Sequence, residues 1–409
     1  MLAVTAIGGA LVAGPAFTQN TSIVARYTLD AGTISGMGAM GRGGSGIGAA
    51  MAMMRDGGAS ARAHELVLRL GTTRTPADGP RADHTLPQTA RFGPVLPLRT
   101  PPRGRSTDTY TPPEMPRGRL LLFWGCGEKA GPGQPVVIDF AKLARGQIPP
   151  GLYAQPLAIA EEWRITQANS RAYGEWPHGE DRQQVPANGS LLGAHKVTGN
   201  YTPEIAFTLD QDFMAPITLA NRAQPSGAYA LSWNAVPAAT GYYAWAFSAK
   251  GERGGGQGAG TGDIVWWTSS ASQAFGGPLW DWLSPAAVRQ LIAAKTVMPP
   301  AQTNCTIPAE VKRAVGEVTM TSLYAYGPER NFSFPPRPAN ARAGWQPEWI
   351  ARARFRSMTM AMLGMDMGAM GGAQASAGDD ATAEPQQPKK PKCRGGLAGI
   401  AQRAAGLCE

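Results

Sequence analysis

Alternating apolar and polar positions predict β-strands along much of the chain. In residues 64–73 (HELVLRLGTT) and 201–210 (YTPEIAFTLD), a large apolar residue recurs at every second position. Because successive side chains of a strand point to opposite faces, this period predicts strands with one buried face. Residues 119–125 (RLLLFWG) form a continuous apolar run, which is typical of a fully buried strand. Further strands are predicted at residues 23–35, 135–140, 229–233, 241–249, 263–270, 317–326 and 349–357.

Few segments have a helical pattern. Residues 284–295 (SPAAVRQLIAAK) give the strongest one, because Ser284 can cap the first turn, Pro285 suits the first helical position and Lys295 suits the last turn. A shorter helix is predicted at residues 139–145. The 409 residues also include 52 glycines and 35 prolines, which favours many turns. These patterns predict a mainly β protein with few short helices.

One segment has a recognisable succession of strand, turn and strand. Tyr229, Leu231 and Trp233 alternate with smaller residues, a turn with Pro237 follows, and GYYAWAFSA is a second alternating strand. Over residues 217–270 this succession resembles the B–C strand region of fibronectin type III and immunoglobulin-like β-sandwiches. The resemblance implies an antiparallel β-sandwich and, by analogy alone, a binding role.

Shifts in composition divide the rest of the chain. Residues 75–117 are rich in proline, arginine and threonine, which predicts a linker or a long surface loop. Residues 371–409 have too few apolar side chains to bury a core and predict a disordered tail. The full predicted order is a signal peptide (1–16), an N-terminal β region with a Gly/Met-rich loop (17–74), the linker or loop (75–117), a mixed β region (118–194), the sandwich with the inserted helix 284–295 (195–335), a strand with a Met-rich hairpin (336–370) and the tail with a Cys-flanked segment (371–409).

The first residues, MLAVTAIGGALVAGPA, predict export. They are apolar and end in a small-x-small pattern at residues 14–16. This arrangement is typical of the core and cleavage region of a secretory signal. The stretch is too short to cross a bilayer, and no other segment supplies the roughly 20 apolar residues that a membrane helix needs. We therefore expect a periplasmic or secreted protein.

The four cysteines, Cys126, Cys305, Cys393 and Cys408, agree with such a compartment. An even number of cysteines in an oxidising environment indicates two disulfides. Cys393 and Cys408 could close one small loop, which would leave the other two as a long-range pair, although three pairings are compatible with the sequence. No C-x-x-C motif occurs, so neither a zinc knuckle nor a thioredoxin-type site is indicated.

Methionines gather in residues 36–54 (GMGAMGRGGSGIGAAMAMM) and 357–372 (SMTMAMLGMDMGAMGG). Thioethers are soft ligands that suit Cu(I), which makes the second segment a candidate copper site. Against copper, none of the four histidines is nearby in the sequence, and methionine is also a flexible core filler. Packing, contact with a partner and peripheral contact with a membrane are the alternatives. The candidate ligands are Met358, Met360, Met362, Met365, Met367 and Met370.

The two methionine segments follow similar strands, ARYTLDAGTIS (25–35) and WIARARFRS (349–357). We predict that these are paired edge strands whose methionine-rich tips touch. In the second strand three arginines alternate with alanine and phenylalanine, so that the arginines share one face. These arginines are Arg352, Arg354 and Arg356.

Six tryptophans lie between residues 233 and 282. Exposed aromatic rings on a β-sandwich serve as sugar platforms or as hot spots for protein partners. Alternation places Trp266 and Trp267 on opposite faces of a strand, so one of them is expected to be exposed. The alternative is that most of these rings belong to the core. The candidate ligand-binding residues are Trp266, Trp267, Trp280, Trp282 and Tyr242.

Catalytic motifs are scarce. Residues 36–41 match G-x-G-x-x-G, but RGGSGIG follows, which is a poor helix start, and no βαβ unit surrounds it. No G-x-S-x-G, H-E-x-x-H or Walker A motif occurs. Acids among aromatic residues at 161–181 would suit glycoside hydrolysis, although surface acids on a loop are the simpler interpretation. These acids are Glu161, Glu162, Glu175, Glu180 and Asp181. No catalytic residue is assigned.

The net charge of +9 comes mainly from arginine. A basic surface can meet anionic polymers, but no basic run with interleaved aromatic residues resembles a nucleic-acid platform, so no nucleic-acid partner is expected. The sequence therefore favours an exported, non-enzymatic envelope protein that binds a protein partner or a glycan without a cofactor. The alternatives are a periplasmic Cu(I)-binding protein and a glycan-active enzyme.

Overall fold

The fold is mainly β. A computed structural model describes residues 23–40, 62–102, 118–147, 163–178, 181, 183–249, 262–275, 277–314, 319–338 and 345–364. The strands are β1 (Ala25–Gly36), β2 (Arg62–Thr72), β3 (Ala82–Thr85), β4 (Val95–Leu98), β5 (Arg119–Trp124), β6 (Val136–Asp139), β7 (Ala172–Trp176), β8 (Gly193–Gly199), β9 (Ile205–Leu209), β10 (Leu219–Ala223), β11 (Tyr229–Trp233), β12 (Gly241–Ala249), β13 (Ile264–Thr268), β14 (Asn304–Ile307), β15 (Met320–Phe334) and β16 (Trp349–Met362). The helices are α1 (Met37–Met40), α3 (Phe140–Leu143), α4 (Pro285–Ala293) and α5 (Ala309–Ala314), with 3-10 turns η1 (Gln88–Ala90) and η3 (Gly277–Trp280). The predicted class, mainly β with few short helices, is confirmed.

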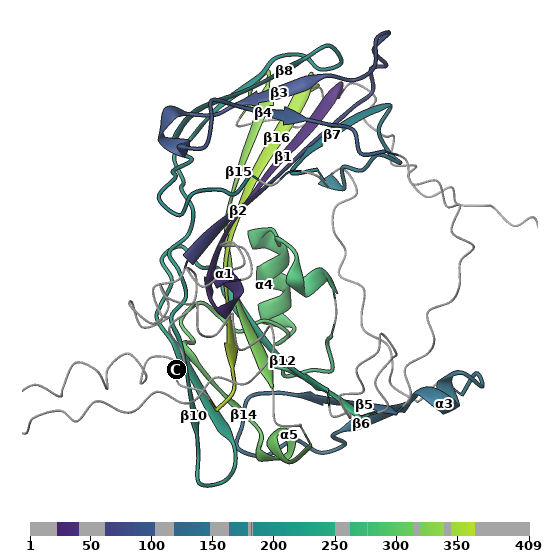
Figure 1. Cartoon of the computed structure of the whole chain (residues 1–409), viewed down its shortest axis with the longest axis vertical. Helices are drawn as coiled ribbons and strands as arrows, with labels where there is room; N and C mark the ends of the chain where they lie inside the picture. The colour runs from purple at the N-terminus through teal and green to yellow at the C-terminus, as the bar shows by residue number, and fades with distance from the viewer. Residues whose placement is uncertain are drawn as a thin grey trace, which may run out of the picture. The chain divides into compact units, whose positions relative to one another are not determined.

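Nine strands form the main sheet, in the order β6-β5-β13-β12-β15-β16-β1-β2-β7. The sheet is mixed, because β1 pairs with β16 and β5 pairs with β13 in parallel, while the other neighbours are antiparallel. Figure 1 shows β15, β16, β1 and β2 running side by side. Strands that are far apart in the sequence therefore meet in one surface.

The predicted pairing of the first and last strands is confirmed, but the prediction that they are edge strands is wrong. β1 and β16 lie in the middle of the nine-stranded sheet, with β2 and β15 on their outer sides. Both are long and buried along most of their length. β16 also continues through Met362, five residues beyond the predicted end.

Two small sheets cover one face of the main sheet. The four-stranded sheet, β4-β3-β8-β9, packs there through Phe207, whose ring centroid lies 6.1 Å from that of Tyr27 in β1. The three-stranded sheet, β10-β11-β14, packs through Trp233, 5.5 Å from the ring of Tyr242 in β12. Between these layers lies a continuous apolar core.

The linker prediction for residues 75–117 is wrong where the structure describes that segment, because residues 82–85 and 95–98 are β3 and β4. Leu96 and Leu98 are buried against the main sheet, although Pro97 separates them. A proline is tolerated here because β4 is an edge strand of the small sheet.

The segment 195–335 is not a self-contained sandwich, because its strands are distributed over all three sheets. β8 pairs with β3, and β9 pairs with β8, while β12, β13 and β15 belong to the main sheet together with β1 and β16 from either end of the described chain. Its predicted boundaries are therefore wrong. β11 and β12, the two strands of the fibronectin-like segment, do lie in different sheets with Trp233 between them. The family resemblance itself stays a prediction.

Helix α4 and the preceding turn cover part of the opposite face of the main sheet. The predicted helix and its start are confirmed, because Ser284 caps it by accepting a hydrogen bond from Ala287 N at 3.2 Å and Pro285 is its first residue. The predicted place of Lys295 in the last turn is wrong, since the helix ends at Ala293. Val288 and Leu291 pack with Tyr243 of β12 in a second apolar cluster. Figure 1 shows α4 alongside the long strands.

One disulfide joins two sheets. Cys126, which follows β5 of the main sheet, is bonded to Cys305 of β14 in the three-stranded sheet. This confirms the predicted long-range pair. Cys393, Cys408, the predicted signal peptide and the predicted tail lie outside the described residues.

Candidate functional site

Two of the five predicted ligand-binding aromatic residues are part of the core. Trp267 is fully buried, and its indole N–H donates to Gly125 O at 2.9 Å. Tyr242 is also fully buried, and its hydroxyl accepts from Val236 N at 2.9 Å. Their packing explains them, and we remove both from the candidate site.

Two others, Trp266 and Trp280, meet on the face of the main sheet that the small sheets do not cover. Their ring centroids lie 5.6 Å apart, and Trp245 lies 5.7 Å from Trp280. Trp280 is 36% exposed, Phe247 41% and Met320 36%. We call this surface the aromatic patch. It consists of Trp245, Phe247, Trp266, Phe275, Trp280 and Met320.

Strand register aligns much of this patch. Trp266 of β13 lies opposite Phe247 of β12, Phe247 lies opposite Met320 of β15, and Met320 lies opposite Met362 of β16. Directly opposed residues point to the same face of a sheet. The four side chains therefore form an uncharged apolar row across four strands.

Three of the six candidate ligand methionines are described, Met358, Met360 and Met362; they share one face of β16, and Met362 belongs to this row. Met358 packs against the second apolar cluster, and Met360 lies against α1, where a methyl group on Gly38 would come within 3.3 Å of its sulfur. The two methionine-rich segments thus touch where they are described. Met365, Met367 and Met370 lie outside the described residues. Copper binding stays a prediction.

The arginines of β16 share one face, as predicted, and all three are buried. We call Arg352, Arg354 and Arg356 the arginine row; their side chains are 4%, 8% and 8% exposed. Arg354 binds Asp30 of β1 through two hydrogen bonds, Nε to Oδ1 at 2.7 Å and Nη2 to Oδ2 at 2.9 Å. Arg69 of β2 also donates to Asp30, at 3.2 Å. Two-point pairing of this kind offsets the cost of burying charge.

A turn of the chain connects the arginine row to the aromatic patch. Arg356 donates to Glu65 Oε2 at 3.0 Å and to the carbonyl of Trp280. Its guanidinium carbon lies 3.6 Å from the ring centroid of Trp282, a cation–π contact. Trp282, also a predicted ligand residue, is buried, and its indole N–H donates to Ala31 O at 3.2 Å. It therefore anchors the turn that carries Trp280.

Sequence reasoning missed the acids that pair with these arginines. Asp30, Glu65 and Glu329 come from three different strands, and only the register of the sheet brings them to one face. The alternation that placed the arginines also applies to Asp30 within its own strand, which was the available signal.

A buried pair of histidines lies on the other face, between β1 and the four-stranded sheet. His84 Nε2 and His195 Nδ1 are 2.9 Å apart, and Tyr27 is hydrogen-bonded to His84 Nδ1. Burial lowers the pKa of both histidines and raises that of Tyr27. The cluster is therefore uncharged at neutral pH and joins the two sheets.

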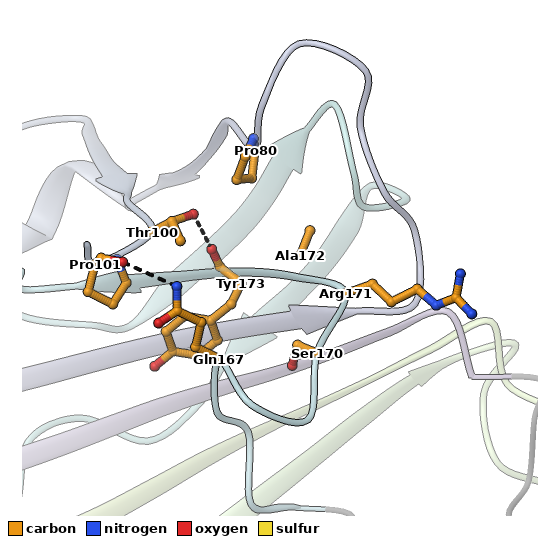
Figure 2. A pocket seen from close by; sticks show the side chains of 8 residues that line it. All are labelled: Pro80, Thr100, Pro101, Gln167, Ser170, Arg171, Ala172 and Tyr173. Carbon is orange, nitrogen blue, oxygen red and sulfur yellow. Dashed lines mark hydrogen bonds between the residues drawn. The ribbon is translucent and has the colours of Figure 1, made fainter. Parts of the chain in front are cut away.

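A cavity of about 300 Å³ opens beside β7, near Pro80, Gln167 and Tyr173. Figure 2 shows that its walls are tied together: Thr100 Oγ1 donates to Tyr173 O at 2.6 Å, and Gln167 Nε2 donates to Pro101 O at 3.2 Å. Arg171 extends away from the other labelled side chains. The polar groups of this cavity thus mainly hold its own walls.

The acids considered for glycoside hydrolysis are only partly described. Glu175 accepts a hydrogen bond from Tyr173 at 2.6 Å, and Asp181 accepts from His178 N at 3.0 Å. Glu161, Glu162 and Glu180 lie outside the described residues. Each described acid has a local partner, which agrees with a structural role.

Within the described ranges, no group of three or more His, Cys, Asp or Glu side chains is placed to hold a metal ion. None of the helices described is long and apolar enough to cross a membrane. No protein-family model matches the chain, and a search of curated proteins found no match. The aromatic patch and the arginine row are therefore interpreted from their own chemistry.

Proposed function

We propose that this is an exported, non-enzymatic binding protein that recognises another protein through the aromatic patch. The observation that supports this is the exposed apolar row, in which Phe247 and Met320 are 41% and 36% exposed beside Trp280 at 36%. Interface cores are enriched in aromatic residues and methionine and depleted in charge. The patch has that composition.

The composition of the patch favours a protein partner over a glycan. Phenylalanine and methionine offer contact area but no hydrogen-bond donor, whereas ligand sites for polar molecules combine apolar walls with a few placed polar groups. The exposed side chains of the patch are Phe247, Met320 and Trp280, of which only Trp280 carries an N–H. Following the signal-like N-terminus, we place the partner in the periplasm or outside the cell.

The patch is rigid enough to act as a preformed surface. Trp280 is held in place, because its carbonyl accepts from Arg356 and Trp282, two residues later, is anchored to Ala31 O at 3.2 Å. Phe247 and Trp266 lie on paired strands. Preorganised side chains lose little conformational entropy on binding, which favours affinity.

The test compares two patch variants with a matched control. Phe247→Ser and Trp280→Ser should each weaken partner binding by about 30-fold, the effect of a hot spot worth about 2 kcal/mol. Phe334→Ser changes a still more exposed phenylalanine, 55% exposed, at the other end of β15, and should bind normally. Cross-linking in an envelope extract, followed by quantitative mass spectrometry, identifies the partner, and titration with that purified protein measures affinity.

Equal capture by all four proteins would contradict the proposal. A panel of labelled polysaccharides is tested in parallel, because loss of glycan binding in the same two variants would replace the protein partner by a glycan. Circular dichroism confirms that each variant is folded before binding is compared.

A further inference from the structure

A second feature, separate from the aromatic patch, is a set of unmet hydrogen-bond donors around Arg352. The Arg352 side chain is 4% exposed, and its Nη1 lies 3.6 Å from Glu329 Oε2. Its Nε and Nη2 have no hydrogen-bond partner among the described residues. These two N–H groups form the side-on edge of the guanidinium, which binds carboxylates and phosphates through two parallel hydrogen bonds.

Two neighbouring side chains have the same deficit. Thr28 of β1 is the register partner of Arg352, and its hydroxyl is buried without a hydrogen-bond partner in the described part of the chain. Arg26, two residues earlier on the same face, has an unmet Nε. Adjacent strands are about 4.8 Å apart, and alternate residues about 6.6 Å. One small group can therefore reach donors from both strands.

The neighbouring arginine shows what such an edge binds in this protein. Arg354 directs its Nε and Nη2 at the two oxygens of Asp30, at 2.7 and 2.9 Å. Arg352 has the same buried setting on the same strand, but no carboxylate lies against its edge among the residues described. Buried polar groups without partners are rare in folded proteins, so a cluster of them calls for a missing partner.

The surroundings of Arg352 fit a small anion. The guanidinium carbon lies 4.5 Å from the ring centroid of Trp163, which covers it. Burial, together with the nearby Arg354, lowers the pKa of Arg352 to about 10, although Glu329, Asp30 and Asp281 act in the opposite direction. The acids present thus compensate this charge incompletely, and a further anion would stabilise it.

We propose that the side-on edge of Arg352, with the hydroxyl of Thr28, binds the carboxylate or phosphate group of a small ligand beneath Trp163. The two guanidinium N–H groups donate to two oxygens of the anion, and Thr28 donates to one of them. The site lies on the arginine row and involves no residue of the aromatic patch. It can be tested independently of the proposed function.

The test measures melting temperature by calorimetry in HEPES–chloride buffer at constant ionic strength, with either inorganic phosphate or malonate added. The wild-type transition should rise by about 3 °C at a hundredfold excess over the dissociation constant. Arg352→Met should remove this dependence. In buffer without either oxyanion it should melt at or above the wild-type temperature, because replacing a poorly paired buried charge by an apolar side chain is neutral or stabilising.

Two controls keep the result interpretable. Arg330→Met removes an arginine whose ion pair with Asp210, at 2.7 Å, lies at the surface, and it should keep the full dependence on oxyanion. Ion chromatography of the denatured wild-type protein detects any carboxylate or phosphate carried through purification. An anion that is found with the wild-type protein and not with Arg352→Met is assigned to this site. If Arg352→Met does not fold, Thr28→Val takes its place and should weaken binding of the anion about tenfold.

A response to phosphate alone or to malonate alone would assign the chemical group. The proposal is overturned if the wild-type protein carries no anion and its melting temperature is the same in chloride, phosphate and malonate. It is also overturned if Arg352→Met, or Thr28→Val in its place, responds as the wild-type protein does.

Discussion

One backbone carbonyl orders the protons of three buried side chains. His195 Nε2 lies 2.7 Å from Leu191 O, and since a carbonyl can only accept, this nitrogen must carry the proton. In the neutral ring His195 Nδ1 then accepts from His84 Nε2, at 2.9 Å. His84 Nδ1 is left to accept from the Tyr27 hydroxyl. Every polar atom of this chain of hydrogen bonds therefore has a partner only while both histidines are neutral.

Lowering the pH below the histidine pKa of the unfolded chain should therefore destabilise the fold. Burial lowers the pKa of His84 and His195 in the folded state, so the unfolded chain binds more protons below its own histidine pKa of about 6.5. The free energy of unfolding should be constant above pH 7 and fall below pH 6.5, by about 1.4 kcal/mol per pH unit for each histidine. Denaturant titrations between pH 5 and 8 measure it.

The matched variant is His84→Gln, whose amide can still accept from Tyr27 and donate to His195 but does not titrate. Below pH 6.5, its free energy of unfolding should fall less steeply with pH than that of the wild-type protein, by the contribution of one histidine, about 1.4 kcal/mol per pH unit. His64, whose pKa is also lowered by burial, contributes equally to both proteins. Identical slopes would contradict the assignment of His84 as a buried, neutral group.

At the scale of the element, a β-bulge in β15 places Glu329 beside Arg352. Tyr326 lies opposite Arg356 and Glu329 opposite Arg354, so β15 uses one more residue than β16 over this interval. Such a bulge returns both residues to the same face of the sheet. Gly327 lies within it, and a Cβ there would come 2.5 Å from Phe355 O, a contact that no real side chain makes.

Gly327→Ala should therefore destabilise the protein by about 1–3 kcal/mol, since backbone and core must shift to accept the methyl group. Its control is Gly277→Ala, because a Cβ at Gly277 would meet nothing within 4 Å. The control should change the free energy of unfolding by less than about 0.5 kcal/mol. Urea titration of both variants provides the measurement, and equal stability would contradict the close approach.

Sequence patterns predicted long elements better than short ones. Alternation placed the arginines of β16 on one face, and Ser284 with Pro285 located the start of α4. It missed β3 and β4, which have four residues each and sit in a proline- and arginine-rich stretch. Such strands show too few periods to be recognised, and the sheet beside them, rather than their own pattern, holds them in place.

At the scale of the whole described fold, most of the strand order could not be predicted from one sequence; the pairing of β1 with β16 was the exception, because their sequences are similar. β5 pairs with β13 in parallel, although the register partners Leu120 and Ile264 lie far apart in the sequence. Nothing local in Leu122 or Trp266 indicates that these residues are register partners. From the sequence, the aromatic patch could therefore be anticipated only as a list of tryptophans. The pairing of β13 with β12 and of β12 with β15 shows that Trp266 lies in one row with Phe247 and Met320.

The Cys126–Cys305 bond connects segments that are distant in the sequence, so its removal tests how much it contributes to the stability of the fold. It joins residues 179 apart and links the main sheet to the three-stranded sheet. A crosslink between distant residues restricts the unfolded chain strongly, so Cys126→Ala/Cys305→Ala should lose about 2–5 kcal/mol of stability. Calorimetry with and without reductant measures the loss. Reductant should lower the melting temperature of the wild-type protein. If reductant also lowers the melting temperature of the double variant, which lacks the Cys126–Cys305 bond, that fall would report the predicted Cys393–Cys408 bond. A double variant as stable as the oxidised wild-type protein would mean that packing between the sheets, and not the disulfide, holds β14 in place.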